Sequence, residues 1–339
     1  MKRLINITDE EYMSCNPLNR ELVEDFLSNS TELSDRTLTA YKSNLRIWIK
    51  WVKDNLDDKL HTDIKPREYL RYQNWLLGLG HSSSDITNKR AAISSLNNYI
   101  VVYYSDMYPM FHNFINKSIK KPEKQFVNEK LPPTREEIDM LINTLEQSNR
   151  KDKLQLIAYI KFCFSTGCRR AEALQIMKNI VDTNPIIKTV KVKDDNGNDV
   201  EKEAIYYLTP KIRCKGRGKT GKIRQLKFSQ EAMDALKNWV NSRDDNCEYM
   251  FVSHSTNNEL MSQASPTVLN DWCTNIFSPI IGRRIHPHIF RESAATDIVV
   301  GQNKSIEAAR SLLGHESSET TKIYVISDDL DSDSDELFI

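Results

Sequence analysis

A basic stretch that contains prolines, KSIKKPEKQFVNEKLPP at residues 117–133, separates two parts of the chain that follow different patterns. Proline lacks a backbone N–H and its ring blocks the preceding turn, so Pro132-Pro133 cannot continue a helix. Thr134 and Glu137 follow at once, with the spacing of a capping box that starts a new helix. The 339 residues are enough for about two domains. We therefore predict an N-terminal extension (1–16), a helical domain (17–116), a linker (117–133), a second domain (134–326) and an acidic tail (327–339).

The first part carries a helical pattern throughout. In SDRTLTAYKSNLRIWIKWV, large apolar residues recur at spacings of three and four: Leu38, Tyr41, Leu45, Trp48 and Val52. Such spacing is one face of an amphipathic helix. The pattern returns at residues 68–77 and again after the HSSSD break. We predict an all-helical domain whose aromatic stripes form its core rather than platforms for stacking on bases.

The second part mixes helices and strands. An apolar helix is predicted from about residue 153 to 165, and Gly167 behind it suits the left-handed turn that ends many helices. Segments at 186–193 and 204–213, and a third that ends at 228, are rich in β-branched and aromatic residues and predict strands. The strands lie together between helices without regular alternation, so we predict an α+β fold.

Composition argues against several classes of protein. No apolar run approaches the ~18 residues of a membrane span. The first residues, MKRLINITDEEYMSC, lack the apolar core of a signal peptide. The spacing of the six cysteines matches no zinc pattern. We therefore expect a cytoplasmic protein with reduced cysteines.

The net charge of zero hides an uneven distribution. The last twelve residues, DDLDSDSDELFI, contain six acidic side chains, and without them 47 basic residues face 41 acidic ones. Because electric fields act locally, a basic surface can coexist with an acidic tail. A nucleic-acid partner is therefore compatible with this composition.

The stretch KGRGKTGKIRQLKF, Lys215 to Phe228, contains the last three letters of a nucleotide-binding P-loop. That motif needs a glycine five residues before its Gly-Lys pair, where this chain has Arg213, and a helix behind it. Apolar residues alternate with Lys227 instead, which favours a strand. The stretch predicts a β-hairpin whose glycine-rich tip carries Lys219. Such a tip suits a nucleic-acid backbone, or is a solvated basic turn.

Three further stretches hold side chains that can handle a phosphate: Arg169 and Glu172 in STGCRRAEAL, His288 and Arg291 in HPHIFRESAAT, and His315 and Tyr324 in SLLGHESSETTKIYV. Each alone has an ordinary explanation, such as a surface ion pair or a core tyrosine. Together, the two arginines can grip the non-bridging oxygens of a phosphodiester with forked hydrogen bonds. Tyr324 would then be the nucleophile and Lys219 the proton donor. Glu172, three residues after Arg169, can orient it.

In this order along the chain, the stretches resemble the pattern of the tyrosine recombinases, the phage-integrase family. Thr166-Gly167-Cys168-Arg169 with Glu172-Ala173-Leu174 resembles the box T-G-x-R-x-x-E-L, Pro287 to Arg291 resembles P-H-x-x-R, and Leu313 to Tyr324 resembles L-G-H-x-x-x-x-T-T-x-x-Y. The resemblance covers most of the chain. It implies an α-helical N-terminal core-binding domain (SAM-like) followed by an α+β C-terminal catalytic domain of the tyrosine recombinase type.

The resemblance also implies an activity and the residues that carry it. Relatives cut and rejoin DNA through a 3′-phosphotyrosine intermediate, with no ATP, no catalytic metal and no other cofactor. The implied catalytic residues are Arg169, Lys219, His288, Arg291, His315 and Tyr324, with Glu172 in support and Lys215 as the alternative to Lys219. Basic residues of the helical domain are candidates for binding the DNA backbone: Arg36, Lys42, Arg46, Lys89 and Arg90.

The partners implied are a double-stranded recombination site, three further copies of the chain in a tetramer on DNA, and an accessory directionality factor. The expected role is integration and excision of a phage or mobile element, in the cytoplasm on bacterial DNA or in the host cytoplasm of a virus. Three alternatives stay open: a Xer-like resolvase of chromosome or plasmid dimers, a DNA-relaxing enzyme similar to type IB topoisomerases, and a DNA-binding regulator without activity.

Two features depart from the family pattern. Glu292 stands where many relatives have a histidine directly after the second arginine. The acidic tail is also unusual. Its last residues, Leu337 to Ile339, could dock on a neighbouring protomer, or the tail is solvated and disordered.

Overall fold

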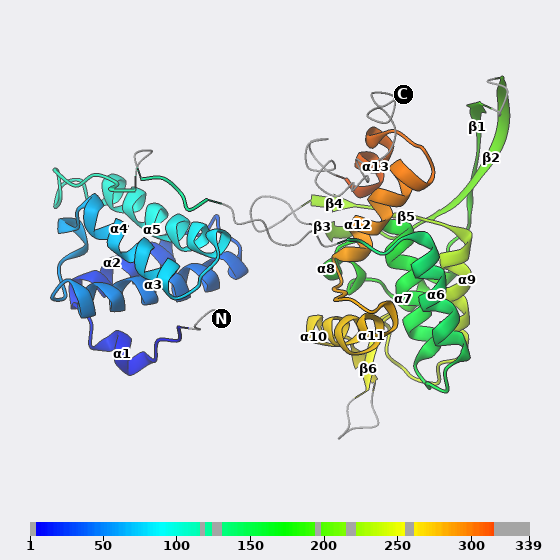
Figure 1. The fold of residues 1–339 in the computed structure, drawn as a ribbon, viewed down its shortest axis with the longest axis horizontal. Helices are drawn as coiled ribbons and strands as arrows, with labels where there is room; N and C mark the ends of the chain where they lie inside the picture. The colour runs from blue at the N-terminus through cyan, green and yellow to red at the C-terminus, as the bar shows by residue number, and fades with distance from the viewer. Residues whose placement is uncertain are drawn as a thin grey trace, which may run out of the picture. The chain divides into compact units, whose positions relative to one another are not determined.

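The chain folds into two compact units in a computed structural model that describes residues 5–115, 119–123, 131–193, 198–214, 222–254 and 261–314. The described residues up to 123 belong to the first unit, and those from 131 onward belong to the second (Figure 1). In these ranges, no helix is long and apolar enough to cross a membrane.

The first unit is built from helices, as the periodicity predicts. Its elements are α1 (Asp9–Met13), α2 (Pro17–Asn29), α3 (Asp35–Asn55), the 3₁₀ turn η1 (His61–Asp63), α4 (Pro66–Gly78) and α5 (Ser83–Tyr103). Residues that cap the N-termini of these helices explain where the helices begin. The backbone N–H groups of the first turn have no acceptor within the helix, and a side-chain hydroxyl can accept from one of them. The Ser34 side chain accepts from the backbone N–H of Thr37 at the start of α3, and the Ser82 side chain accepts from the backbone N–H of Asp85 at the start of α5.

The apolar stripes of these helices form the core of the first unit. Leu45, Trp48 and Val52 of α3 are fully buried. Trp48 packs edge-on against Tyr72 of α4, with ring centroids 4.9 Å apart, in the range where aromatic pairs attract. The prediction that the aromatic residues are core is confirmed for these positions.

The first unit also includes residues that we predicted to lie outside it. Tyr12 of α1 and Cys15 are buried in the helical core, although residues 1–16 were expected to be an extension. Arg46 holds α1 in place, because it pairs with Asp9 at 2.7 Å and its guanidinium lies 4.6 Å from the centroid of the Tyr12 ring. Ile119, from the predicted linker, belongs to the same core. The helical core therefore extends beyond 17–116 at both ends.

A buried histidine makes the first unit sensitive to acid. His61 is fully buried; its Nδ1 accepts from Trp48 Nε1 at 3.0 Å and its Nε2 lies 2.6 Å from Asn97 Oδ1. Desolvation lowers the pKa of His61 to about 4 and outweighs the hydrogen bond to Asn97, which raises it. Between this pKa and the ordinary ~6.5 the unfolded chain binds more protons, so stability falls as pH falls through that window.

We expect the free energy of opening of α3 to fall by about 2 kcal/mol between pH 7 and pH 5, because of His61 alone. Amide hydrogen exchange of α3 in the full chain measures this energy. His61→Gln keeps a donor and an acceptor but does not titrate, so its opening energy should lack this fall. An equal fall in both proteins would contradict the assignment.

The second unit is mixed. Its helices are α6 (Arg135–Gln147), α7 (Lys153–Thr166), α8 (Arg170–Ala173), η2 (Lys178–Asp182), α9 (Gln230–Asn241), α10 (Pro266–Asp271), the π-helical turn η3 (Trp272–Phe277), α11 (Ser278–Ile281), α12 (Ile289–Thr296), the π-helical turn η4 (Asp297–Gly301) and α13 (Ile306–Leu313). Its strands are β1 (Ile186–Lys193), β2 (Asp199–Leu208), β3 (Ile212–Cys214), β4 (Lys222–Arg224), β5 (Lys227–Phe228), β6 (Val252–His254) and β7 (Met261–Gln263). The predicted capping box is present at α6, where Thr134 and Glu137 bond reciprocally.

The strands in the described part of this unit form three small antiparallel sheets, in the orders β1-β2-β5, β3-β4 and β6-β7. Strands β1 and β2 pair from Ile186↔Tyr206 to Lys193↔Asp199 and extend away from the helices (Figure 1). The strand predicted over 204–213 is two strands, β2 and β3. The break lies at Thr209-Pro210, where Thr209 bonds to Leu226 and the proline offers no N–H to a ladder.

Helix α7 is the centre of the second unit. It is mostly apolar, most of its side chains are buried, and it packs against α6, α9, α12 and β5. The Tyr159 ring meets Phe251, Trp272 and Phe290 edge-on. Because α7 packs against four other elements, the residues that follow its C-terminus start from a well-supported position.

Candidate active site

Arg169 lies directly beyond the C-terminus of α7. The helix ends at Gly167, whose φ of 57° is the left-handed conformation predicted for it. Arg169 is the N-cap of α8, and its backbone N–H and its Nη1 each donate to the Glu172 carboxylate at 2.9 Å. The predicted contact between Arg169 and Glu172 is therefore present. It leaves the Arg169 side chain 26% exposed.

Glu172 is the carboxylate at the centre of the candidate site, and its side chain is only 2% exposed. Burial alone would raise the pKa of this carboxyl. The backbone N–H of Arg169, the charge of Arg224 and the Arg169 guanidinium together outweigh burial and hold the pKa below its ordinary value. A buried carboxylate is thus kept ionised between two guanidinium groups.

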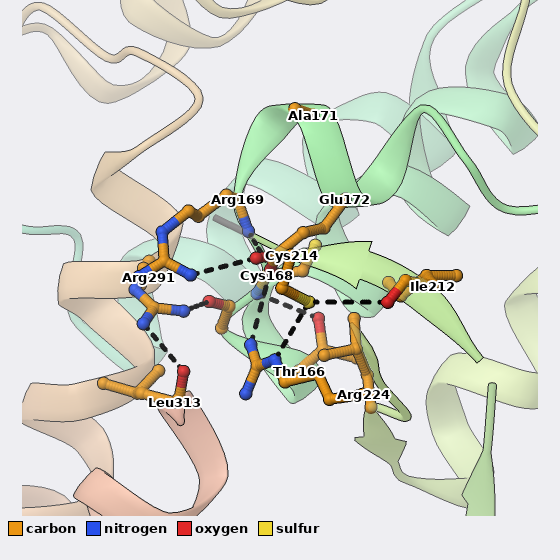
Figure 2. A network of polar contacts seen from close by, with 12 residues as sticks. Thr166, Cys168, Arg169, Ala171, Glu172, Ile212, Cys214, Arg224, Arg291 and Leu313 are labelled. Atoms are coloured by element: carbon orange, nitrogen blue, oxygen red, sulfur yellow. Dashed lines mark hydrogen bonds and ion pairs between the residues drawn. The ribbon is translucent and has the colours of Figure 1, made fainter. Parts of the chain in front are cut away.

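Arg291 brings three separate stretches of the chain together. It lies on α12 and is fully buried. Its Nη1 donates to the carbonyl of Gly167 at 2.6 Å, and its Nη2 donates to the carbonyl of Leu313 at 2.8 Å. Figure 2 shows Arg291 and Arg169 on one side of this network, with Leu313 below them. The boxes that hold Arg169, Arg291 and Leu313 therefore meet at one guanidinium, as a shared site requires.

His288 also belongs to this part of the fold. It is the N-cap residue of α12, it is partly exposed, and its carbonyl accepts the backbone N–H of Arg291 at 3.1 Å. Gly314 ends α13 in a left-handed conformation, with φ of 64°. The remaining catalytic candidates, Lys219, Lys215, His315 and Tyr324, lie outside the described residues, as does the acidic tail.

Arg224 is a member of the network that the sequence reasoning missed. It lies on β4, and its Nη2 is 3.4 Å from Glu172 Oε2. Its Nη1 donates to the carbonyl of Leu312 at 3.2 Å. Its Nε donates to Cys214 Sγ at 3.2 Å, as Figure 2 shows. No spacing in the sequence separates Arg224 from the other basic residues of Lys215 to Phe228. Only the tertiary contacts identify it.

The candidates for DNA backbone binding differ in exposure. Arg36 and Lys42 of α3 are exposed. Arg46 is partly exposed and is held by Asp9, as described above. Exposed cations can exchange water for phosphate oxygens at little cost, so Arg36 and Lys42 are the better placed of these three.

Lys89 and Arg90 of α5 are buried. The Lys89 ammonium donates to Asn44 Oδ1 at 3.0 Å and lies 3.4 Å from Asp85. The Arg90 guanidinium lies 6.0 Å from the centroid of the Tyr69 ring. In this conformation both side chains contribute to the packing of the helical unit, which weighs against their binding a phosphate.

Within the described ranges, no group of three or more histidine, cysteine, aspartate or glutamate side chains is arranged to hold a metal ion. The polar side chains that meet around Glu172 are guanidinium groups and a thiol, and these suit an anion better than a cation.

The family model for the phage integrase family matches residues 134–330, more than half of the chain. The SPbeta prophage-derived recombinase-like protein YomM of Bacillus subtilis (strain 168) is 29% identical over 324 residues, which cover 95% of this chain and 90% of that protein. Tyrosine recombinase XerC of Pediococcus pentosaceus is 22% identical over 316 residues, which cover 89% of this chain and 91% of that protein.

Two solved structures share the fold. The Tn1549 transposon integrase in complex with transposon right-end DNA has a TM-score of 0.65 at 13% identity, over 95% of this chain and 98% of that one. The XerH site-specific recombinase bound to palindromic difH substrate has a TM-score of 0.61 at 17% identity, over 95% of this chain and 94% of that one. The predicted fold class, a helical domain followed by an α+β catalytic domain, is confirmed. The chain belongs to the phage integrase family and is a tyrosine site-specific recombinase.

Proposed function

We propose that this recombinase integrates and excises a phage or mobile genetic element, by cutting and rejoining DNA strands at a specific double-stranded site. The observation that carries the proposal is the position of Arg291, whose buried guanidinium joins the Gly167 turn to Leu313. This contact joins the turn two residues before Arg169 to Leu313, two residues before His315 in the sequence. Relatives with a prophage or transposon origin in their names support the mobile-element role.

In the proposed reaction, the phenolic oxygen of Tyr324 attacks the scissile phosphorus. A bond forms between them, the bond from phosphorus to the 5′ oxygen breaks, and Lys219 gives that oxygen a proton. His288 accepts the phenolic proton. Tyrosine is a weak nucleophile at neutral pH because its pKa is near 10, so cationic groups must favour the phenolate. The product is a 3′-phosphotyrosine and a free 5′ hydroxyl, and attack by another 5′ hydroxyl reverses the step.

Arg169 and Arg291 would bind the non-bridging oxygens and stabilise the charge that develops on them, with a further hydrogen bond from His315. If Lys219 is not the proton donor, Lys215 takes this place. Arg36 and Lys42 would bind the DNA backbone, with a strong dependence of affinity on salt. We further propose a tetramer on DNA, an accessory directionality factor, and a location on DNA in the bacterial or host cytoplasm.

The test starts from a binding site selected out of a library of randomised duplexes. The selected duplex is made with a nick beside each phosphate in turn, so that the short 5′-hydroxyl fragment diffuses away after cleavage. We expect a covalent protein–DNA adduct, and peptide mass spectrometry should place the nucleotide on Tyr324. Failure to select any duplex, binding without an adduct, or an adduct on another residue would each reject the proposal. Relaxation of a supercoiled plasmid that lacks the site would favour a topoisomerase-like enzyme.

A second candidate role is the resolution of chromosome or plasmid dimers, because relatives named XerC and XerD cover most of the chain at 22–25% identity. Recombination of the selected site with an identical copy of itself would favour this role. Recombination only between two different sites would favour the integrase.

A further inference from the structure

Arg224 is the residue of the network for which the reaction above provides no task. It is held in one orientation from three sides, since Nε, Nη1 and Nη2 each have a partner. Its side chain is 20% exposed, so the ion pair with Glu172 is largely shielded from water. A guanidinium is suited to this arrangement because its donors point in fixed directions in one plane.

The first partner of Arg224 leads to Arg169. Glu172 Oε2 accepts from the backbone N–H of Arg169 and also faces Arg224, while Oε1 holds the Arg169 guanidinium. The orientation of the carboxylate thus decides the orientation of the Arg169 side chain. Arg224 contacts the carboxylate at Oε2, and the dashed lines of Figure 2 show Arg169 and Arg224 meeting at this group.

The second partner leads to the end of α13. Leu312 accepts from Arg224 Nη1, and the guanidinium lies so close to Gly314 that a Cβ at Gly314 would collide with Nη1. Gly314 is the residue directly before His315. The glycine therefore allows both the left-handed turn and the approach of the guanidinium.

The third relation is to the hairpin. Arg224 is the last residue of β4, whose partner β3 ends at Cys214, and Cys214 Sγ accepts from Arg224 Nε. β3 and β4 are therefore joined both by their backbone ladder and by this side-chain contact. Lys215 and Lys219 both fall in the stretch between these two strands.

We propose that Arg224 is a positioning residue, which fixes the distance between the Glu172–Arg169 pair, the end of α13 and the base of the hairpin. The proposal rests on the proposed function, because it assigns Arg224 to the assembly of that same site. Arg224 touches no reacting atom in this proposal; it acts through Glu172 and through the backbone of α13. Small displacements of groups in a site are enough to lower a rate strongly.

Single-turnover cleavage of the selected, nicked duplex tests the proposal, with the rate constant and the reactive fraction measured separately. For Arg224→Gln we expect the rate constant to fall about 10- to 100-fold. The reactive fraction, and the DNA affinity measured in the Tyr324→Phe background, should stay unchanged. A loss of reactive fraction or of affinity with an unchanged rate constant would mean that Arg224 only stabilises the fold, and would overturn the proposal.

Two further variants sharpen the result. Arg224→Lys keeps the charge but cannot reach three partners at once, so it should recover only a small part of the lost rate; full recovery would exclude the bridging geometry. In a double-mutant cycle with Glu172→Gln, the two losses should be strongly non-additive if Arg224 acts through the carboxylate. Additive losses would contradict the proposed path to Arg169.

Arg283→Gln is the matched control, since Arg283 also binds a carboxylate, that of Glu137, in the same unit. Its cleavage rate constant should equal that of the wild type. Wild-type protein that forms no adduct would refute the proposed function itself, whereas a normal rate in Arg224→Gln beside an active wild type would refute only the positioning role.

Discussion

Replacing Arg291 by lysine should lower the single-turnover rate of adduct formation by about 100-fold or more. The arginine spans two carbonyls, those of Gly167 and Leu313, with two different nitrogens. One ammonium cannot reproduce this fork, so the two boxes lose their common anchor. If Arg291 also contacts the scissile phosphate, as we propose, the transition state loses a donor in the same substitution.

The same substitution should cost some stability. A carbonyl left buried without its donor costs about 1–3 kcal/mol. The rate of adduct formation must therefore be compared with a variant that suffers a similar structural loss elsewhere. The rate constant must be measured for the folded, DNA-bound protein only, so that a loss of folded protein is not mistaken for slower cleavage.

Arg243 provides this comparison. Its side chain is only 3% exposed, and its guanidinium binds Asp245 and the carbonyls of Cys247 and Tyr249. None of these partners lies in the three boxes or in the hairpin stretch Lys215 to Phe228. Arg243→Lys should lower the melting temperature about as much as Arg291→Lys, yet leave the rate constant of cleavage unchanged. Equal rate losses in the two variants would show that Arg291 is a structural residue only.

The local features of the second unit could be predicted because they depend on neighbouring residues. The capping box at Thr134, the left-handed end at Gly167 and the Arg169–Glu172 contact each involve residues at most four apart in sequence. The chemistry of a short segment fixes such features before any tertiary contact forms. The predicted strand over 204–213 was wrong in one detail, the break at Pro210, and that proline was visible in the sequence.

The features that could not be predicted depend on long-range contacts. Arg224 is 52 residues from Glu172, and a basic residue on a strand has no periodicity that reveals such a partner. The burial of Lys89 and Arg90 has the same origin. Their positions on α5 are helical, but the face of a helix that lies inward follows from packing against its neighbours rather than from charge. Tyr12 likewise lies in the helical core through contacts with residues distant in sequence, among them Arg46.

Gly167→Ala should destabilise the second unit by about 2–4 kcal/mol, because two penalties combine at one residue. The φ of 57° is unfavourable for any residue with a Cβ, and the new methyl group would collide with Leu313 Cδ2. Hydrogen exchange of α7 amides measures the loss in the full chain. Gly282 distinguishes the conformational penalty from the steric penalty. Its φ is 78° but no atom lies within 4 Å of its Cβ position, so Gly282→Ala should cost only the conformational part, about 1–2 kcal/mol.

The collision also connects stability to the site, since the carbonyl of the same Leu313 accepts from Arg291. The new methyl group must displace the buried Leu313 side chain, and because the same residue holds Arg291 through its carbonyl, adduct formation should slow together with the loss of stability. Leu313→Ala removes the colliding branch. Combined with Gly167→Ala, it should cost less than the sum of the two single losses, and the cleavage rate should recover relative to Gly167→Ala alone. If the stability losses of the two single variants simply add, Gly167 and Leu313 are not in contact. The close packing of the Gly167 turn against α13, on which the convergence at Arg291 depends, would then be contradicted.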